Sequence, residues 1–138
     1  MHPIEALASE RFKDSLGPEV SAGLELVGFC RPRGEGSLCE VAELIRSAVE
    51  HCRQRGVTRL LVDLTGVTGF SIPSLVDRFI LAEELAQEAQ SKVAVALVVR
   101  EEYIHPEKFG VAVAARFGLK LDVFSSEPEA LVWISSLS

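Results

Sequence analysis

The stretch LLVDLTGVTGFSIPSL, residues 60–75, contains an apolar run, a turn-rich loop and the start of a helix in immediate succession. Leu60–Val62 is continuously apolar, as expected of a parallel strand that is buried on both faces. The loop Thr65–Phe70 is rich in Gly and Thr, and Ser71 is a good helix N-cap with Pro73 in the first turn. The stretch therefore predicts a strand–loop–helix unit, the repeating element of parallel α/β sheets.

Upstream of this unit, helical periodicity begins at Ser37. Ser37 and Glu40, three residues later, form a capping-box pattern. Apolar residues then recur at three- and four-residue spacing, which predicts one buried helix face, and Gly56 is the expected stop. The members of that face are Val41, Leu44, Ile45, Ala48 and Cys52.

Downstream of the unit, helices and strands continue to alternate. Val93–Val99 is the strongest buried-strand signal in the chain, and Leu121–Phe124 predicts the last strand. One helix begins at Pro106 and ends at Gly118, and the final helix opens at Ser126. The predicted inner face of the helix after Ser71 is Leu75, Val76, Phe79, Ala82, Ala86 and Ala89, with Asp77, Arg78, Glu84 and Glu88 facing water; that of the next helix is Phe109, Val113 and Phe117.

The strict alternation from Ser37 onward predicts an α/β fold with a mixed, largely parallel sheet of four to five strands, about four helices and right-handed crossovers. Residues 1–36 are the least readable part. Leu7–Phe12 could form a strand or a short helix that Gly17-Pro18 breaks. Val20–Phe29 has strand character, with Gly28 as a candidate bulge, and the two strands could pair as an edge hairpin. No linker divides the chain, so residues 1–138 are expected to form one domain.

The composition disfavours several classes of function. The 138 residues are 48% hydrophobic and carry a formal charge of −6, an ordinary globular composition that argues against a nucleic-acid partner. The one dense basic group, Arg53, Arg55 and Arg59, is interpreted as a solvated helix end. The longest apolar run is far shorter than the ~20 residues that span a bilayer, and the first residues lack the features of a signal peptide. We therefore expect a soluble cytoplasmic protein with no transmembrane segment.

The cysteines do not form a recognisable site. Cys30, Cys39 and Cys52 are widely spaced without a Cys-x-x-Cys pair, which favours reduced structural thiols over a disulfide framework or a zinc site. His51 does not pair with Cys52, because adjacent helical residues do not face one another. Asp63, at the end of a strand, could hold a metal or a phosphoryl group, but we favour hydrogen bonding within its own turn. We expect neither a metal nor a cofactor.

The segment VDLTGVTGFSIPSL (62–75) resembles the signature of the STAS family. Its SpoIIAA-like anti-sigma factor antagonists carry a strand, then V-D-L-S-G-V-T, then an Asp-Ser-Ser-Gly-Leu turn into a helix. The segment FGLKLDVFSSEPEALVWI (117–134) is similar to the family's ending, so the resemblance covers roughly Leu60–Leu137. It implies a STAS/SpoIIAA-like fold and a bacterial-type regulatory module that meets protein partners.

The chain departs from the family pattern at the phosphoacceptor. Laid on this sequence, the Asp of the family's turn falls on Ser71 and the acceptor serine on Ile72. Isoleucine has no hydroxyl, so the resemblance implies a divergent member without the usual switch. Ser71 and Ser74 flank this position and are candidates for phosphorylation, because a phosphate is favourable at a helix N-terminus. The alternative is that Ser71 is an N-cap and Ser74 a polar residue of the first turn.

The loops that follow the predicted strands are the candidate binding surface. Ligands and partners of parallel α/β sheets meet the loops beyond the carboxyl ends of the strands, so we expect these loops to share one rim. The loop 100–108 holds the chain's only Tyr and a dense set of charges, and Ser125–Glu127 lies in the third loop. The candidate contact residues are Thr65, Thr68, Ser71, Ser74, Arg100, Glu102, Tyr103, His105 and Lys108.

Three functions remain open from the sequence. The leading hypothesis is a non-catalytic regulatory or protein-interaction module that uses this rim, with a homodimer as one arrangement. The second is a small-molecule or lipid-binding domain, since SpoIIAA-like folds also resemble lipid carriers and since Leu81 and Leu85 extend the apolar surface of the second helix. The third is a small hydrolase built from Ser71, His105 and Glu102. Because the surroundings of Ser71 lack a G-x-S-x-G elbow, we do not expect an enzyme.

Overall fold

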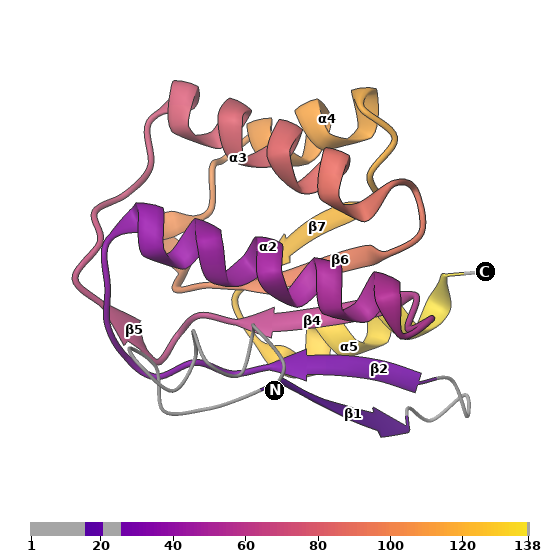
Figure 1. The fold of residues 1–138 in the computed structure, drawn as a ribbon. Coiled ribbons are helices and arrows are strands. Elements are labelled where there is room, and N and C mark those ends of the chain that lie inside the picture. Colours follow the sequence, from indigo (N-terminus) through magenta and orange to yellow (C-terminus); the bar gives the residue numbers. More distant parts are fainter. Residues whose placement is uncertain (1–15, 21–25, 138) are drawn as a thin grey trace.

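The computed structural model describes residues 16–20 and 26–137, which form a central sheet with helices on both faces (Figure 1). Within these residues the main sheet has five strands in the order β1-β2-β4-β6-β7. β1 runs antiparallel to β2, and the other neighbours are parallel. The predicted α/β class with a largely parallel sheet is therefore confirmed. The strands are β1 (Leu16–Val20), β2 (Leu26–Cys30), β4 (Arg59–Asp63), β6 (Ala94–Val98) and β7 (Leu121–Phe124).

Strands β4 and β6 lie side by side at the centre of the sheet. Leu60 is opposite Val95, and Val62 is opposite Leu97. Successive residues of a strand point to opposite faces, so Leu60 joins the core on one face while Leu61 joins the core on the other. Both faces are covered, which is why these strands are continuously apolar.

The helices are distributed unequally over the two faces (Figure 1). Helices α2 (Leu38–Gln54), α3 (Leu75–Ala89) and α4 (Phe109–Arg116) cover one face, and α5 (Glu127–Ser136) covers the other. The main neighbours of α3 are α2 and α4 rather than strands. Among the described residues, no helix combines the length and the apolar character that crossing a bilayer requires.

Helix α2 begins as predicted, but α3 begins three residues later than predicted. Ser37 accepts a hydrogen bond from the Glu40 amide while the Glu40 carboxylate accepts from the Ser37 amide. The cap of α3 is Ser74, which forms the same reciprocal box with Asp77. The prediction of Ser71 as N-cap was wrong. A capping box needs an acidic residue three positions after the cap, and only Ser74 of the two serines has one.

The buried face of α3 agrees with the prediction only in part. Ala82, Ala86 and Ala89 are buried as predicted, together with Leu85, all in the C-terminal two-thirds of the helix. Leu75, Val76 and Phe79, also predicted to face the core, are 52%, 66% and 41% exposed. The small alanines allow α3 to pack closely on its neighbouring helices, whereas the apolar residues of its first turns are exposed.

Helix α4 begins at Phe109, not at Pro106, after Lys108 in the left-handed conformation. Val113 is buried as predicted, together with Ala114. Phe117, also predicted to face inward, is 44% exposed. Its ring lies edge-to-face with that of Phe79 on α3, 6.0 Å between centroids, so the two aromatic residues cover one another at the surface.

The N-terminal hairpin exists, but with a different first strand. Gly17 and Pro18 were predicted to interrupt secondary structure, but they lie within β1, which pairs in continuous register with β2. A proline is tolerated there because β1 is an edge strand with a neighbour on one side. Leu7–Phe12 lies outside the described residues. Two short strands that were predicted as loop, β3 (Gly34–Glu35) and β5 (Val67–Thr68), pair with each other in parallel.

Gly28 is not a bulge, since the register of β2 runs through it. A Cβ atom at this position would lie 2.9 Å from the sulfur of Cys52, so glycine allows α2 to approach the sheet closely. Cys30 and Cys52 are buried and Cys39 is exposed. Burial raises the pKa of the Cys52 thiol to about 12, which agrees with its predicted structural role.

The interpretation of Arg59 as solvated was wrong. Arg59 lies in β4 and is 9% exposed. Its Nε donates to the carbonyl of Ile134 at 2.9 Å, and its Nη2 donates to the carbonyl of Leu137. A guanidinium is favourable there because the last carbonyls of a helix lack partners within the helix and carry partial negative charge.

Candidate functional site: an apolar cavity between the sheet and helix α3

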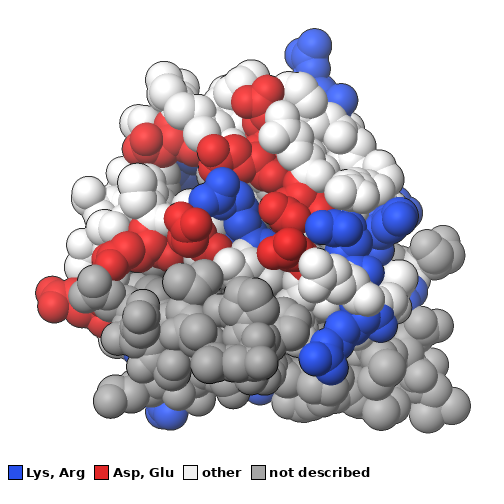
Figure 2. Space-filling model, in the orientation of Figure 1, with Lys and Arg blue, Asp and Glu red and all other residues white. Residues whose placement is uncertain are grey.

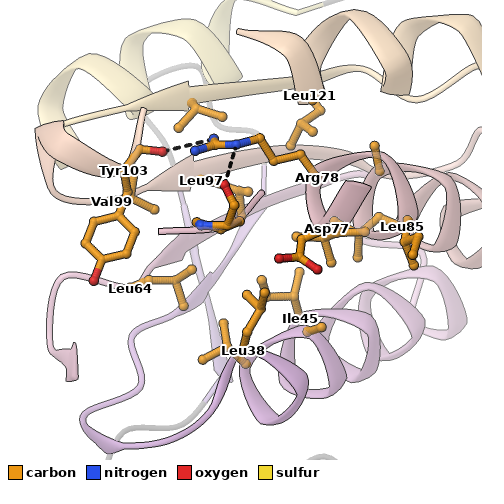
Figure 3. Close-up of a pocket in the computed structure, with 18 of the residues that line it drawn as sticks. Leu38, Ile45, Leu64, Asp77, Arg78, Leu85, Leu97, Val99, Tyr103 and Leu121 are labelled. Atoms are coloured by element: carbon orange, nitrogen blue, oxygen red, sulfur yellow. Dashed lines mark hydrogen bonds between the residues drawn. The ribbon is translucent and has the colours of Figure 1, made fainter. Parts of the chain in front are cut away.

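A cavity of about 390 Å³ lies between the sheet, α2 and α3, at the carboxyl ends of the central strands (Figure 3). Helix α3 packs mainly on α2 and α4 rather than on the strands, which leaves this space between α3 and the sheet. The exposed residues Cys39 and Asp77 are among its lining, which places its opening between the N-terminal ends of α2 and α3. The volume falls within the range of small-molecule sites, about 300–1,000 Å³.

The walls of the cavity are mostly aliphatic and come from elements far apart in the sequence. Beta-strand ends and the residues just beyond them form its floor, α2 forms one side and α3 forms the roof (Figure 3). Leu81 and Leu85, which the sequence singled out as extra apolar surface, are part of the roof. The apolar lining includes Leu38, Val41, Ile45, Leu64, Leu81, Ala82, Leu85, Leu97, Val99, Leu121 and Val123.

Charged side chains also line the cavity, and most have a partner of opposite charge. Arg46 of α2 lies 3.2 Å from Glu43 and 3.9 Å from Glu84 of α3. Lys108 lies 2.7 Å from Asp122 of β7. Figure 2 shows acidic side chains across the middle of the face over α2 and α3, with one basic group among them and further basic groups toward the right of the view.

Arg78 differs from these groups because its partners are neutral carbonyls. Its Nε donates to the carbonyl of Pro73 and its Nη1 to the carbonyl of Tyr103, both at 3.1 Å. Figure 3 shows its side chain extending from α3 across the cavity to Tyr103. The helical periodicity predicted that Arg78 faces water, but its side chain is half-buried.

The loops after β4 and β6 meet at one edge of the sheet, as predicted. The Tyr103 hydroxyl donates to the carbonyl of Phe70 at 2.8 Å, and the two rings are 5.1 Å apart. Arg100 Nη2 lies 3.4 Å from the carbonyl oxygens of both Thr65 and Val67. Tyr103 thus has a structural role in joining the loops, and its ring also lines the cavity.

The other candidate contact residues lie around this edge in different surroundings. His105 and Lys108 line the cavity, and His105 Nδ1 accepts a hydrogen bond from the Glu107 amide at 3.1 Å. Ser71 is exposed in the loop before α3 and is not part of the lining, so the cavity does not bring it together with His105. Thr68 and Glu102 are exposed. Ser74 uses its hydroxyl to cap α3.

Asp63 forms hydrogen bonds within its own turn, as the sequence predicted, and it also contacts Glu127, which the sequence did not predict. Its Oδ1 accepts from the Thr65 amide at 2.9 Å and from the Thr65 hydroxyl at 2.6 Å. The Asp63 carboxylate also forms a hydrogen bond with the Glu127 carboxyl at the start of α5. Glu127 is in turn paired with Arg31, whose Nε lies 2.9 Å from Glu127 Oε2. The third predicted loop therefore joins the same edge.

The two carboxyls have pKa values shifted in opposite directions. Burial raises the pKa of Asp63, but the hydrogen bonds from Glu127 and Thr65 and the charge of Arg31 outweigh it, so the pKa is lowered. The hydrogen bonds from Arg31 lower the pKa of Glu127, but burial and the neighbouring Asp63 outweigh them, so the pKa is raised. Of the two carboxyls, Glu127 therefore takes up its proton at the higher pH.

Comparison with known proteins does not assign the chain to a family. No protein-family model matches it, and no curated protein does. Among the described residues, no group of three or more His, Cys, Asp or Glu side chains has an arrangement that could hold a metal ion. The cavity and the loops around it are therefore interpreted from their geometry and chemistry.

Proposed function

We propose that this domain binds a small apolar molecule in the cavity beneath α3. The observation that supports the proposal is the cavity itself, about 390 Å³ enclosed mainly by aliphatic side chains. Side chains around an empty space lack van der Waals contacts on one side, and an apolar ligand supplies those contacts. The apolar surface of the ligand is also removed from water, which is favourable. Burial of each CH₂ group contributes roughly 0.8 kcal/mol, before the cost of ordering the ligand.

A neutral, environment-sensitive dye tests this proposal. We expect saturable binding of N-phenyl-1-naphthylamine to the wild-type domain, and no binding to Ala82→Leu, because the larger side chain occupies the cavity from its roof. Ala112→Leu is the matched control: it makes the same change on α4, at an exposed position outside the lining. Native mass spectrometry of the purified protein provides a second measurement. A bare mass together with absence of dye binding would contradict the proposal.

A protein-interaction module remains the second candidate, supported by the apolar surface at the start of α3. Ile72, Leu75 and Val76 are 55%, 52% and 66% exposed, and Phe79 and Ile80 continue this surface. Exposed apolar groups of this kind are typical of surfaces that contact other proteins. The resemblance of residues 62–75 to STAS-type antagonists also supports this candidate, because that family would meet its partners at the same turn and helix.

Paired charge substitutions test this second candidate. We expect Val76→Glu to abolish recovery of a specific partner, or to shift a homodimer to monomer in sedimentation equilibrium. Val132→Glu is the matched control, since Val132 is 72% exposed but lies on α5, on the opposite face of the sheet. A monomeric wild type that recovers the same background proteins as both variants would count against it.

A further inference from the structure

We infer that the cavity selects an amphiphile with an anionic carboxylate head, and that Arg78 holds this head. The inference rests on the proposed function and adds the chemical class of the ligand. The ligand would have an unbranched or aromatic apolar tail and one carboxylate, as in a medium-chain fatty acid.

The distribution of charge around the cavity distinguishes Arg78 from the other cations. Arg46 already has two carboxylate neighbours, Glu43 at 3.2 Å and Glu84 at 3.9 Å. Lys108 is neutralised by Asp122 and lies over the ring of Phe124. Arg78 is a cation of the lining whose interactions, among the described residues, are with carbonyl oxygens alone. A half-buried guanidinium without a counter-charge is a favourable site for an anion.

The negative groups of the lining are occupied as well. Asp77, the neighbour of Arg78, accepts a hydrogen bond from the Ser74 amide at 3.0 Å. Its carboxylate therefore lies at the N-terminal end of α3, where the helix carries partial positive charge. Glu43 and Glu84 share Arg46. A cationic head would therefore have to compete with existing partners for these carboxylates, whereas a carboxylate head would meet Arg78 without displacing an ion pair.

The geometry of Arg78 suits a carboxylate. A guanidinium has five N–H donors, and the bonds to Pro73 and Tyr103 use one on Nε and one on Nη1. The remaining donors lie on the two Nη nitrogens, a planar pair that matches the two oxygens of a carboxylate. The carbonyl bonds already orient the side chain, so little of its conformational freedom is lost when the ligand binds.

The size of the cavity limits the tail. With roughly 30 Å³ for a group the size of a water molecule, the 390 Å³ would hold about a dozen non-hydrogen atoms. Decanoate has this size, and it can place its carboxylate at Arg78 with its tail among Leu81, Leu85 and Leu97. Decanol and decylammonium provide neutral and cationic probes with the same tail.

Titration calorimetry with decanoate, decanol and decylammonium tests the inference. In the wild type we expect decanoate to bind about 10- to 100-fold more tightly than decanol, the range for hydrogen bonds to a charged group. Arg78→Met should abolish this preference, so that the variant binds decanoate no more tightly than it binds decanol. Arg78→Lys should retain part of the preference. Arg116→Met, which removes the same charge from an exposed site on α4, should bind all three as the wild type does.

The outcomes separate this inference from the proposed function. Equal affinity for decanoate and decanol in the wild type, or undiminished decanoate binding by Arg78→Met, would overturn the role of Arg78 while apolar binding stood. Tightest binding of decylammonium would overturn it too. If decanoate, decanol and the neutral dye all failed to bind the wild-type domain, the proposal that the cavity is a binding site would be refuted instead. Saturable decanol binding by Arg78→Met, at whatever affinity, shows that the variant is folded.

Discussion

The two faces of the sheet are built from the same strands but are packed differently. On one face, α5 lies directly on the strands, and Leu61, Val98 and Ile134 are at most 1% exposed in one continuous cluster. On the other face, α3 is held away from the strands by α2 and α4, and the cavity lies beneath it. The two faces therefore differ in how fully the space above the strands is filled: the α5 face is closely packed, whereas the α3 face contains a cavity.

Truncating a leucine on each face should reveal this difference most strongly. Leu61→Ala removes a side chain packed on all sides against the α5 cluster, and we expect it to lower the free energy of unfolding by about 4 kcal/mol. Leu97→Ala acts on the cavity wall, where partner atoms are already missing on one side, and should cost about 2 kcal/mol. Urea unfolding followed by the fluorescence of Trp133 measures both. Equal losses would mean that the α3 face is packed as fully as the other.

A pair of glycines tests how packing varies within the α3 face itself. Gly28→Ala places a Cβ atom 2.9 Å from the Cys52 sulfur under α2, and should destabilise by about 1–3 kcal/mol through overpacking. Gly110→Ala, at the start of α4, brings its Cβ no closer than 3.9 Å to Arg78. Because alanine favours the helix, this change should be neutral or stabilise by up to about 1 kcal/mol. Thermal unfolding checks both, and a stable Gly28→Ala would show that α2 has room to move.

The smallest effect concerns the acidic pair that joins β4 to α5. Asp63→Asn removes a negative neighbour from Glu127, so the raised pKa of Glu127 should fall. The control is Asp122→Asn, which removes a carboxylate at β7 and should leave that pKa unchanged. Carbon-detected NMR titration of the Glu127 carboxyl measures the shift, and an unaltered pKa in Asp63→Asn would contradict the coupling.

The same pair predicts a pH dependence of stability. Asp63 has a lowered pKa in the folded state, so its contribution is present above its unfolded pKa and is lost as the pH falls through the folded value. Glu127 has a raised pKa, so its contribution is present below its unfolded pKa and is lost as the pH rises through the folded value. Wild type should therefore lose a small stabilisation on both sides of the ordinary carboxyl range. Asp63→Asn should lack the loss at the higher pH, because Glu127 no longer has the negative neighbour that raises its pKa.

Several parts of the fold could be predicted because their signals are local. The capping box at Ser37 requires residues three apart, and the buried strands at Leu60–Val62 and Val93–Val99 require a short apolar run. When helices and strands alternate along a chain, the right-handed crossovers and short connections allow few sheet topologies. The position of the loops after β4 and β6 at the same edge of the sheet was therefore predictable too.

The cavity and the position of Arg78 could not be predicted in this way. Leu75, Val76 and Phe79 follow a regular helical pattern, yet they are exposed because the contacts of α3 with α2 and α4 determine its rotation. Arg78 looks like any charged residue of an exposed face, and only the carbonyls of Pro73 and Tyr103 direct it across the cavity. Periodicity along a chain specifies which residues share a helix face, since that depends on neighbours in sequence. The distance between that face and the sheet depends on side chains from several other segments, and it is set only when the chain packs together.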